Sequence, residues 1–435
     1  MREKMKELLL ILICNFFFFL QQGCHSRDEV KNFTLINLSH LEHLSEEISI
    51  NNQSMRIVRI YSEYPEYQYV GDDDEGITCV DDVARLAVFY SHYYQYTNDY
   101  SVLHKCRGFL EFLKYMQDKN GLFYNFIYSD HSINKTHKNS ISTASWWSWR
   151  AIWAFAEAYH IFKESDSVYA NDLLKRIEHT YPALDSVMQK YPQTFVLEGL
   201  IMPEWLPYRT AADQAAVILS ALALSYSANR DNRIKQYIKK LAEGITTMQL
   251  GDSLLFPFGC FLSWENSWHA YGNSQAYALL STGSTQNNQA YIKRAMNEIN
   301  YFYPFLVANN YFNCLEFSYR KNVYNTVQEV QYPQISYGIR PMVWACLKAY
   351  DITGDEKFAK MAGQIGSWLL GNNVTGQLMY DPKTGRCYDG IENTQNINKN
   401  SGAESTIEAL LTIQEIEQNP IAKQICIDFY KNKGN

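Results

Sequence analysis

The sequence has little that would indicate covalent cross-links, a structural metal or a nucleotide cofactor. Its nine cysteines include no CxxC pair, and an odd number, seven, remains once Cys14 and Cys24 are set aside. This pattern predicts neither a disulfide framework nor a zinc site. The two histidines of HLEH at 40–43 have no evident third ligand, so we expect no metal. No G-x-G-x-x-G or Walker loop occurs, and we expect no cofactor.

Positive charge is also scarce. Lysine and arginine number 39 against 46 aspartate and glutamate, which gives a formal net charge of −7 at pH 7. Nucleic-acid binding needs a basic face that displaces counterions, so no nucleic-acid partner is expected. Aromatic residues, by contrast, are abundant, with 33 Tyr, 22 Phe and 9 Trp. Tyrosine and tryptophan suit a surface that stacks against flat sugar faces while offering OH and NH groups.

Only the start of the chain holds a long apolar run. A basic beginning is followed by the apolar stretch 8–20, which is too short for a comfortable membrane span. Gly23-Cys24 then resembles the cleavage box of bacterial lipoproteins, with Cys24 as the lipidated residue, and simple secretion is the alternative. We therefore expect a signal peptide over 1–24, a lead or tether over 25–54, and an outer-membrane or periplasmic lipoprotein whose lipid anchor holds it to the membrane.

The rest of the sequence is dominated by a helical repeat. Six segments combine a polar or small-residue start with about four turns of apolar residues at helical spacing. They begin at Asp81, Trp146, Ala211, Gly272, Gly338 and Ser401. More charged amphipathic helices are expected between them, over 99–118, 166–190, 230–249, 286–307, 355–370 and 420–433.

This alternation of apolar and amphipathic helices predicts an all-α fold. Mostly apolar helices would form an inner ring and the amphipathic ones an outer ring, giving an (α/α)6 hairpin toroid over 55–435. A seventh pair would come from 38–59. The long connections have strand or turn character, so we expect them to form loops and short β-hairpins on one face of a single domain.

In such a toroid, the starts of all inner helices open onto one end of the barrel, where long loops usually carry function. Polar and aromatic residues from six places would converge there. The residues predicted to bind substrate at this end are Arg150, Arg209, Trp146, Trp147, Tyr124, Asn125, Glu204, Trp205, Trp264, Glu265, Asn273 and Glu404.

Arginines near these helix starts indicate an acidic ligand. Arg150, Arg209 and Arg340 stand among aromatic or small residues, where a guanidinium needs an anionic partner. One interpretation is a pair with a protein carboxylate, for which Asp213 and Glu404 are candidates. The other is a carboxylate of the substrate, such as a polyuronic acid.

A polyuronate would make β-elimination a natural reaction. The reaction removes the proton at C5 and expels the 4-linked oxygen, so it needs a group that neutralises the carboxylate, a base and an acid. We predict His269, Tyr271 and Tyr337 for acid–base work, with Asn266 or Arg340 neutralising the carboxylate. The alternatives are a hydrogen-bonded rim histidine and tyrosines that only pack in the wall.

The hairpin repeat, the lipoprotein-like start and this Asn/His/Tyr/Arg set resemble the helical-toroid polysaccharide lyases of gut Bacteroidetes. In size and layout the chain is most similar to the alginate and glucuronan lyases of polysaccharide lyase family 38, over about residues 55 to 420. The resemblance implies that an Asn or Arg neutralises the carboxylate while His and Tyr act as base and acid. It thus implies an enzyme acting on an acidic polysaccharide or oligosaccharide.

Two other functions remain open. A glycoside hydrolase on the same scaffold would need two carboxylates flanking the bond that breaks. Glu204 and Glu265 lie among Pro, Trp and Tyr that could desolvate them, and further rim acids include Asp72, Asp73, Asp74, Glu75, Asp81, Asp82, Asp213 and Glu404. A non-catalytic glycan-binding lipoprotein would use the tryptophans alone as a stacking platform.

Overall fold

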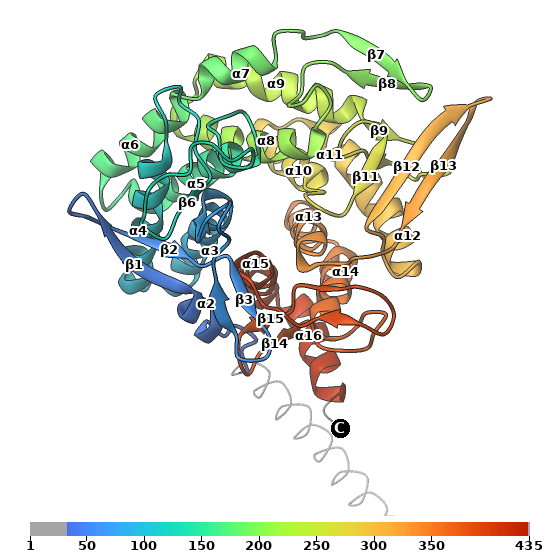
Figure 1. The fold of residues 1–435 in the computed structure, drawn as a ribbon. Coiled ribbons are helices and arrows are strands. Elements are labelled where there is room, and N and C mark those ends of the chain that lie inside the picture. Colours follow the sequence, from blue (N-terminus) through green and yellow to red (C-terminus); the bar gives the residue numbers. More distant parts are fainter. Residues whose placement is uncertain (1–32, 434–435) are drawn as a thin grey trace, which may run out of the picture.

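The protein folds as a closed ring of helical hairpins. The structure is a computed structural model that describes residues 33–433, so the predicted signal peptide, Cys24 and residues 25–32 lie outside the described residues. Six inner helices contact one another in sequence, and the last contacts the first, which closes the ring (Figure 1). They are α3 (Val80–Thr97), α5 (Trp146–Phe162), α8 (Ala212–Asn229), α10 (Gln275–Gln286), α13 (Arg340–Thr353) and α15 (Ala403–Gln418).

Each inner helix pairs with an outer partner that follows it in the chain. The outer layer consists of α4 (Tyr100–Met116), α6 (Ser167–Glu178), α7 (Tyr181–Val187), α9 (Asn232–Thr247), α11 (Gln289–Asn297), η1 (Glu298–Phe302), α12 (Tyr303–Ala308), α14 (Glu356–Gly366), η3 (Ser367–Leu370) and α16 (Pro420–Lys433). The predicted (α/α)6 toroid and its six inner segments are confirmed.

Residue patterning explains the two layers. In α8, apolar and small residues occupy nearly every position, and the helix is buried on all sides for most of its length. In α9, Ile234, Ile238 and Leu241 recur at helical spacing and are buried, whereas Lys235 and Lys239 lie on the exposed face. A helix of the first kind is stable only inside the ring, and one of the second kind only at its outer surface.

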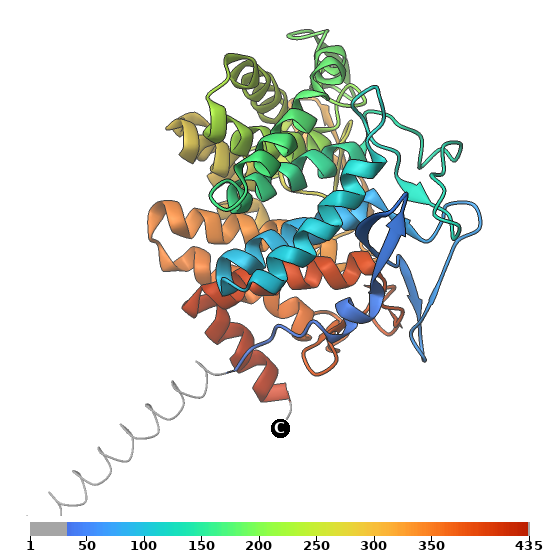
Figure 2. The same cartoon turned by 90° about the vertical axis from the view of Figure 1, so that its left-hand side faces the viewer.

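The connections differ sharply between the two ends of the ring. Turns from inner to outer helices are short, such as Asn98-Asp99 between α3 and α4, whereas returns to the next inner helix are long. The returns and the N-terminal segment carry the strands at one end of the ring (Figure 2). The antiparallel pairs are β1 (Ser45–Ile50) with β2 (Gln53–Val58), β3 (Tyr61–Glu63) with β4 (Gln68–Val70), β5 (Thr78–Cys79) with β6 (Phe126–Ile127), β7 (Thr194–Leu197) with β8 (Leu200–Pro203), β9 (Gln249–Leu250) with β10 (Cys260–Phe261), β14 (Tyr380–Asp381) with β15 (Arg386–Cys387) and β16 (Gly390–Ile391) with β17 (Ile397–Asn398).

One sheet has three strands. In it β12 (Cys314–Arg320) pairs with both β11 (Ser267–His269) and β13 (Val323–Val330). A single turn of 3-10 helix, η2 (Ser336–Gly338), then leads into α13. The predicted β-hairpins on one face are therefore present.

The N-terminal segment differs from its prediction. Residues 38–59 form no seventh helical pair but a one-turn helix, α2 (Ser39–Leu44), followed by the β1–β2 hairpin. Leu35, Leu41 and Leu44 are fully buried in the main core, so the tether predicted over 25–54 is wrong from residue 33 onward. The strand-like alternation of SEEISI and QSMRIV is the reason, because it buries Ile48, Met55 and Ile57 on one face.

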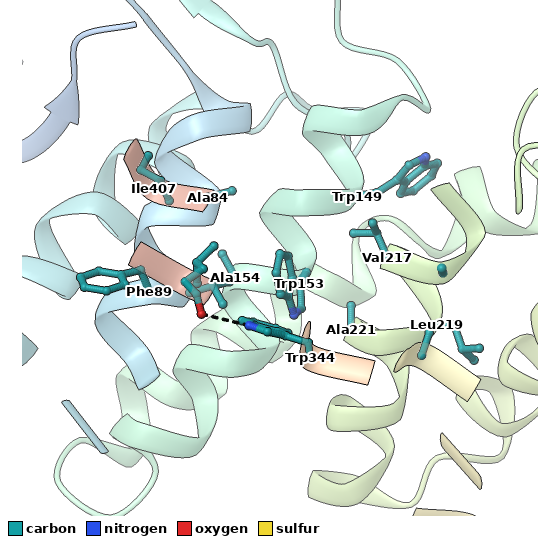
Figure 3. Packing of buried hydrophobic residues seen from close by; sticks show 14 of the residues in the cluster. Ala84, Phe89, Trp149, Trp153, Ala154, Val217, Leu219, Ala221, Trp344 and Ile407 are labelled. Carbon is teal, nitrogen blue, oxygen red and sulfur yellow. Dashed lines mark hydrogen bonds between the residues drawn. The ribbon is translucent and has the colours of Figure 1, made fainter. Parts of the chain in front are cut away.

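The centre of the ring is packed with tryptophan. Trp344 of α13 lies edge-on to Trp153 of α5, with ring centroids 6.0 Å apart, and its indole Nε1 donates to the Leu411 carbonyl at 3.0 Å (Figure 3). Tyr277 and His92 also pack against Trp344, at centroid distances of 5.2 and 5.3 Å. Large rings therefore fill the barrel axis, and the space above them is a closed-bottomed bowl rather than a channel.

A buried acid in the outer layer gives stability a pH dependence. Glu298 begins the π-helical turn η1 and accepts a hydrogen bond from the Phe261 amide at 2.8 Å, with only 1% of its surface exposed. Burial raises its pKa from 4.5 to about 8. The protonated form therefore stabilises the fold, fully so below pH 4.5, and this contribution is lost as the pH rises through about 8.

We expect Glu298→Gln to remove this dependence. Because a pKa difference of one corresponds to about 1.4 kcal/mol, the free energy of unfolding of the parent should fall relative to the variant by roughly 3–5 kcal/mol over that pH range. Urea denaturation of both proteins at a series of pH values measures the difference. Parallel pH profiles would show that Glu298 does not titrate as described.

Over residues 33–433, no helix is both long enough and apolar enough to cross a membrane. The seven cysteines of this part are free thiols, and six of them are buried: Cys79, Cys106, Cys260, Cys346, Cys387 and Cys426.

Candidate functional site

A cavity of about 600 Å³ lies at the end of the ring where the inner helices begin. The long returns build its walls, and residues from the first turns of α3, α5, α8 and α15 reach into it. The lining residues are Asp81, Arg85, Asn125, Phe126, Asn139, Trp146, Trp147, Arg150, Tyr208, Ala211, Asp213, Gln214, Trp264, His269, Tyr271, Tyr337 and Glu404. Its volume is in the range of small-molecule sites.

Nine of the residues predicted to bind substrate or to act in catalysis line this cavity, in addition to the rim acids Asp81 and Asp213. They are Asn125, Trp146, Trp147, Arg150, Trp264, His269, Tyr271, Tyr337 and Glu404. These residues are up to 279 positions apart in the chain, from 125 to 404, and the closed ring brings them together. The convergence of inner-helix starts on one bowl therefore holds in the structure.

The predicted arginines all have carboxylate partners within the protein. Arg150, which is 4% exposed, forms an ion pair with Asp81 and donates from Nη2 to the Tyr337 hydroxyl at 2.6 Å. Arg340 lies below the cavity, where its Nε pairs with the buried Glu408. These pairs correspond to the first of the two interpretations open from the sequence, in which the arginines pair with protein carboxylates, but the partners differ from the candidates: Asp213 pairs with His269 and Glu404 with Arg85.

Arg209 does not reach the cavity. Its side chain is 56% exposed, pairs with Glu204 at 3.1 Å and stacks over Phe195. Glu204 also accepts a hydrogen bond from Lys190 at 2.6 Å. Arg209, which has a positive φ of 73° in the turn before α8, and its partner Glu204 are therefore absent from the lining of this cavity.

Other predicted residues serve the scaffold. Asn266 donates from Nδ2 to the Phe317 carbonyl at 3.0 Å, which ties β11 to β12. Trp205 is buried and donates to the Lys240 carbonyl at 2.8 Å. Glu265, Tyr124 and the buried Asn273 are also absent from the lining. Each lies within three positions of a lining residue, and sequence position alone could not distinguish the lining residues from the others.

Asp213 and His269 form a pair in the wall of the cavity. His269 ends β11, and its Nε2 lies 3.0 Å from Asp213 Oδ2 in the first turn of α8. The Asp213 side chain is only 4% exposed, whereas that of His269 is 22% exposed. Burial raises the pKa of Asp213, and the hydrogen bond from His269 only partly offsets it. Asp213 therefore holds a proton more readily than an ordinary aspartate.

Asp81 has the opposite environment. Burial disfavours its charged form, but the Arg150 and Arg85 guanidiniums outweigh that effect and hold its pKa below the usual range. Arg85 Nη2 lies 3.4 Å from Asp81 Oδ2. Asp81 is therefore a carboxylate that stays ionised in the cavity.

Arg85 is a lining residue that sequence reasoning missed. The Arg85 side chain is only 3% exposed. It forms ion pairs with Asp82 and Glu404 at 2.6 Å and with Glu408 at 3.1 Å. The available signal was its place one turn after Asp81 and Asp82 on the same helix. A single arginine inside an apolar inner helix needs such partners.

Aromatic rings cover much of the remaining wall. Trp264 and Tyr208 are 44% and 57% exposed at the mouth, and Trp146 lies under the Arg150 guanidinium at 4.7 Å. Gly272, at φ +74°, allows the chain to pass close to these groups, since a Cβ there would lie 3.0 Å from the Tyr337 hydroxyl. Exposed rings next to buried polar groups are typical of sugar sites. Over residues 33–433, no cluster of three His, Cys, Asp or Glu side chains is arranged to hold a metal ion.

No protein-family profile and no curated protein matches the sequence. Solved structures do match the fold. A sugar epimerase from a ruminal bacterium has a TM-score of 0.59 at 11% identity, covering 83% of this chain and 92% of its own. A D-mannose isomerase has a TM-score of 0.57 at 13% identity, covering 92% of this chain and 97% of its own.

A family 76 glycoside hydrolase from a bovine Bacteroides thetaiotaomicron strain has a TM-score of 0.51 at 10% identity, covering 92% of this chain and 78% of its own. The fold is an (α/α)6 toroid. At these identities the similarity establishes the fold alone, and function has to be argued from the site. The resemblance to family 38 lyases stays a prediction.

Proposed function

We propose that the protein is a glycoside hydrolase acting on a neutral glycan, with Asp213 as general acid and Asp81 as the ionised carboxylate. One observation carries this proposal: both residues line one cavity, where His269 contacts Asp213 and two guanidiniums contact Asp81. Their pKa values move apart, up for Asp213 and down for Asp81. Such opposed environments assign acid and base roles to two carboxyl groups.

The two residues would divide the chemistry as follows. Asp213 would donate its proton to the glycosidic oxygen as the bond to the anomeric carbon breaks, and His269 would hold the resulting carboxylate through the 3.0 Å contact. Asp81 would either take the proton of the water that attacks the anomeric carbon, or attack that carbon itself to form a glycosyl ester that water then hydrolyses. The exposed Trp264 and Tyr208 rings would stack on the sugar.

The charge of the cavity favours a neutral substrate. Its described lining includes the carboxyl groups of Asp81, Asp213 and Glu404 against the guanidiniums of Arg85 and Arg150. Both guanidiniums already pair with carboxylates. A uronate would therefore compete with protein carboxylates for every lining arginine, whereas a neutral sugar would not.

This assignment predicts a bell-shaped pH profile. Hydrolysis needs Asp81 ionised, so kcat/KM should fall as the pH drops through its lowered pKa, and needs Asp213 protonated, so it should fall again as the pH rises through the raised pKa. Initial rates between pH 3 and pH 9 measure both limbs. Asp213→Asn should abolish the alkaline limb in the residual activity, and a variant that kept this limb would contradict the assignment.

A substrate panel tests the reaction itself. The full chain would be incubated with glucans, mannans, xylans and arabinans, and with alginate, glucuronan and pectic acid. We expect new reducing ends from a neutral glycan without new near-ultraviolet absorbance. Conversion of free sugars with no bond cleavage, as in an epimerase, would contradict a hydrolase.

A polysaccharide lyase is the second candidate, because His269, Tyr271 and Tyr337 share the cavity and Arg150 donates to the Tyr337 hydroxyl. Elimination would leave a double bond conjugated with the carboxyl group, so alginate or glucuronan would gain absorbance. His269→Ala and Tyr337→Phe should then both lose activity. Absorbance gain with a polyuronate would favour this reaction over hydrolysis.

The place of action is also a proposal. The features at 1–24 support secretion and anchoring through Cys24, and a glycan substrate outside the cytoplasm would fit both. Incorporation of labelled palmitate into the full chain, and its loss in Cys24→Ser, would test the anchor.

A further inference from the structure

We infer that the site takes a chain of several sugars and cleaves it internally, because the main cavity continues into two further cavities along the mouth of the ring. This inference rests on the proposed function. The second cavity, of about 340 Å³, shares five lining residues with the first: Asp81, Arg85, Asn125, Phe126 and Glu404. The third, of about 380 Å³, shares Ile335 and Asp389 with the second.

The second cavity has the composition of a sugar subsite. Tyr61 of β3, 40% exposed, offers a ring face, and its hydroxyl donates to Glu75 at 3.2 Å. Asp389 also lines this cavity and is held by the Gly402 amide at 2.9 Å and the Ser405 hydroxyl at 2.6 Å. An aromatic face and a fixed carboxyl group are what a pyranose needs for stacking and for hydrogen bonds to its hydroxyl groups.

The third cavity extends the same pattern. It is lined by Tyr332, Asp389, Glu392 and Asn398, with backbone from the β16–β17 hairpin. The Tyr332 hydroxyl is buried and has no hydrogen-bond partner within the described chain. Glu392 is exposed at the outer edge. A hydroxyl-rich ligand entering here would meet the carboxyl groups of Asp389 and Glu392 and the amide of Asn398.

Asp81 lies within this groove rather than at its end. Asp81 borders both the first and second cavities, whereas Asp213 and His269 line the first alone. A chain lying along the groove would therefore place sugars on either side of Asp81, with the bond that breaks near the junction. Binding energy from the outer cavities can then be used to position that bond, so longer substrates should react faster.

The experiment measures kcat/KM against chain length. Oligomers of two to six units would be prepared from whichever polysaccharide of the panel is cleaved. We expect kcat/KM for the hexamer to exceed that for the dimer by about tenfold or more, because the outer cavities bind the additional sugars in the transition state. Tyr61→Ala should lower kcat/KM for the hexamer several-fold more than kcat/KM for the dimer, and so remove much of this gain. Tyr96→Ala, an exposed tyrosine at the far end of α3, is the matched control and should change neither.

Two failures are distinguishable. Equal kcat/KM for dimer and hexamer would overturn the groove while leaving the hydrolase intact. If no polysaccharide is cleaved, the proposed function fails, and calorimetry with dimers and hexamers of β-1,4-linked glucose, mannose and mannuronate decides on the groove. Tighter binding of one hexamer that Tyr61→Ala weakens would support it, and equal affinity within all three series would overturn it.

Discussion

Asn in place of Asp213 is expected to lower kcat on an unactivated glycan by about 10²–10⁴-fold, the usual contribution of a general acid. Asn keeps the size and the hydrogen-bonding capacity that the contact to His269 needs, at 3.0 Å in the parent protein, so the fold should persist. The Asn amide, however, cannot protonate the leaving oxygen. Rates of reducing-end release by parent and variant, with circular dichroism as a check on folding, measure the effect.

A substrate whose leaving group needs no proton distinguishes the role of Asp213 from that of Asp81. With a nitrophenyl glycoside of the same sugar, Asp213→Asn should regain most of its rate, whereas Asp81→Asn should stay inactive because the ionised carboxylate is still missing. Glu204→Gln is the matched control, since Glu204 lies outside the cavity lining and pairs with Lys190. Activity of Asp213→Asn within threefold of the parent on the unactivated glycan would remove Asp213 from the mechanism.

Removal of the Glu408 charge is expected to destabilise the fold by about 3–5 kcal/mol, the range for breaking a buried ion pair. Glu408 is fully buried and lies between Arg85, at 3.1 Å, and Arg340. In Glu408→Gln, Arg85 would keep Asp82 and Glu404, but Arg340 would lose the only ion pair it has among the described residues. A buried, uncompensated guanidinium is the source of the loss.

Two comparisons make this result specific. Glu356→Gln removes an exposed pair with Lys360 and should change the free energy of unfolding by no more than about 1 kcal/mol. A Glu408→Leu and Arg340→Met double variant should recover much of the loss, because both charges go together. Urea denaturation gives all three values. A single variant as stable as the parent would show that Arg340 finds another partner or water.

The sequence predicted the helical ring well because the relevant signal is local. Each inner helix shows itself by apolar residues at helical spacing, and all six observed helices begin within three residues of the predicted starts. The N-terminal segment was harder to predict. A tether is expected over 33–54, but the strand pair at 45–58 packs against α4, and Leu35 and Leu41 are fully buried.

The sequence predicted part of the site because the start of each inner helix is also a local signal. Position near an inner-helix start correctly placed Arg150, His269 and Tyr337 at the cavity, because the ring directs every start to one end. It could not distinguish these from Arg209 or Asn266, whose side chains turn to Glu204 and Phe317. Nor could it show that Arg85 would reach Glu404, 319 residues away.

Residue order by itself determined which segments coil into helices and which of them must be shielded from water, since burial follows from side-chain chemistry along each turn. The tertiary structure alone decided the charge of the bowl. Whether a guanidinium there faces a ligand or a carboxylate of its own chain depends on distances of a few ångströms between distant segments, and the pairing of Arg150 with Asp81 is what directs the proposal to neutral sugars.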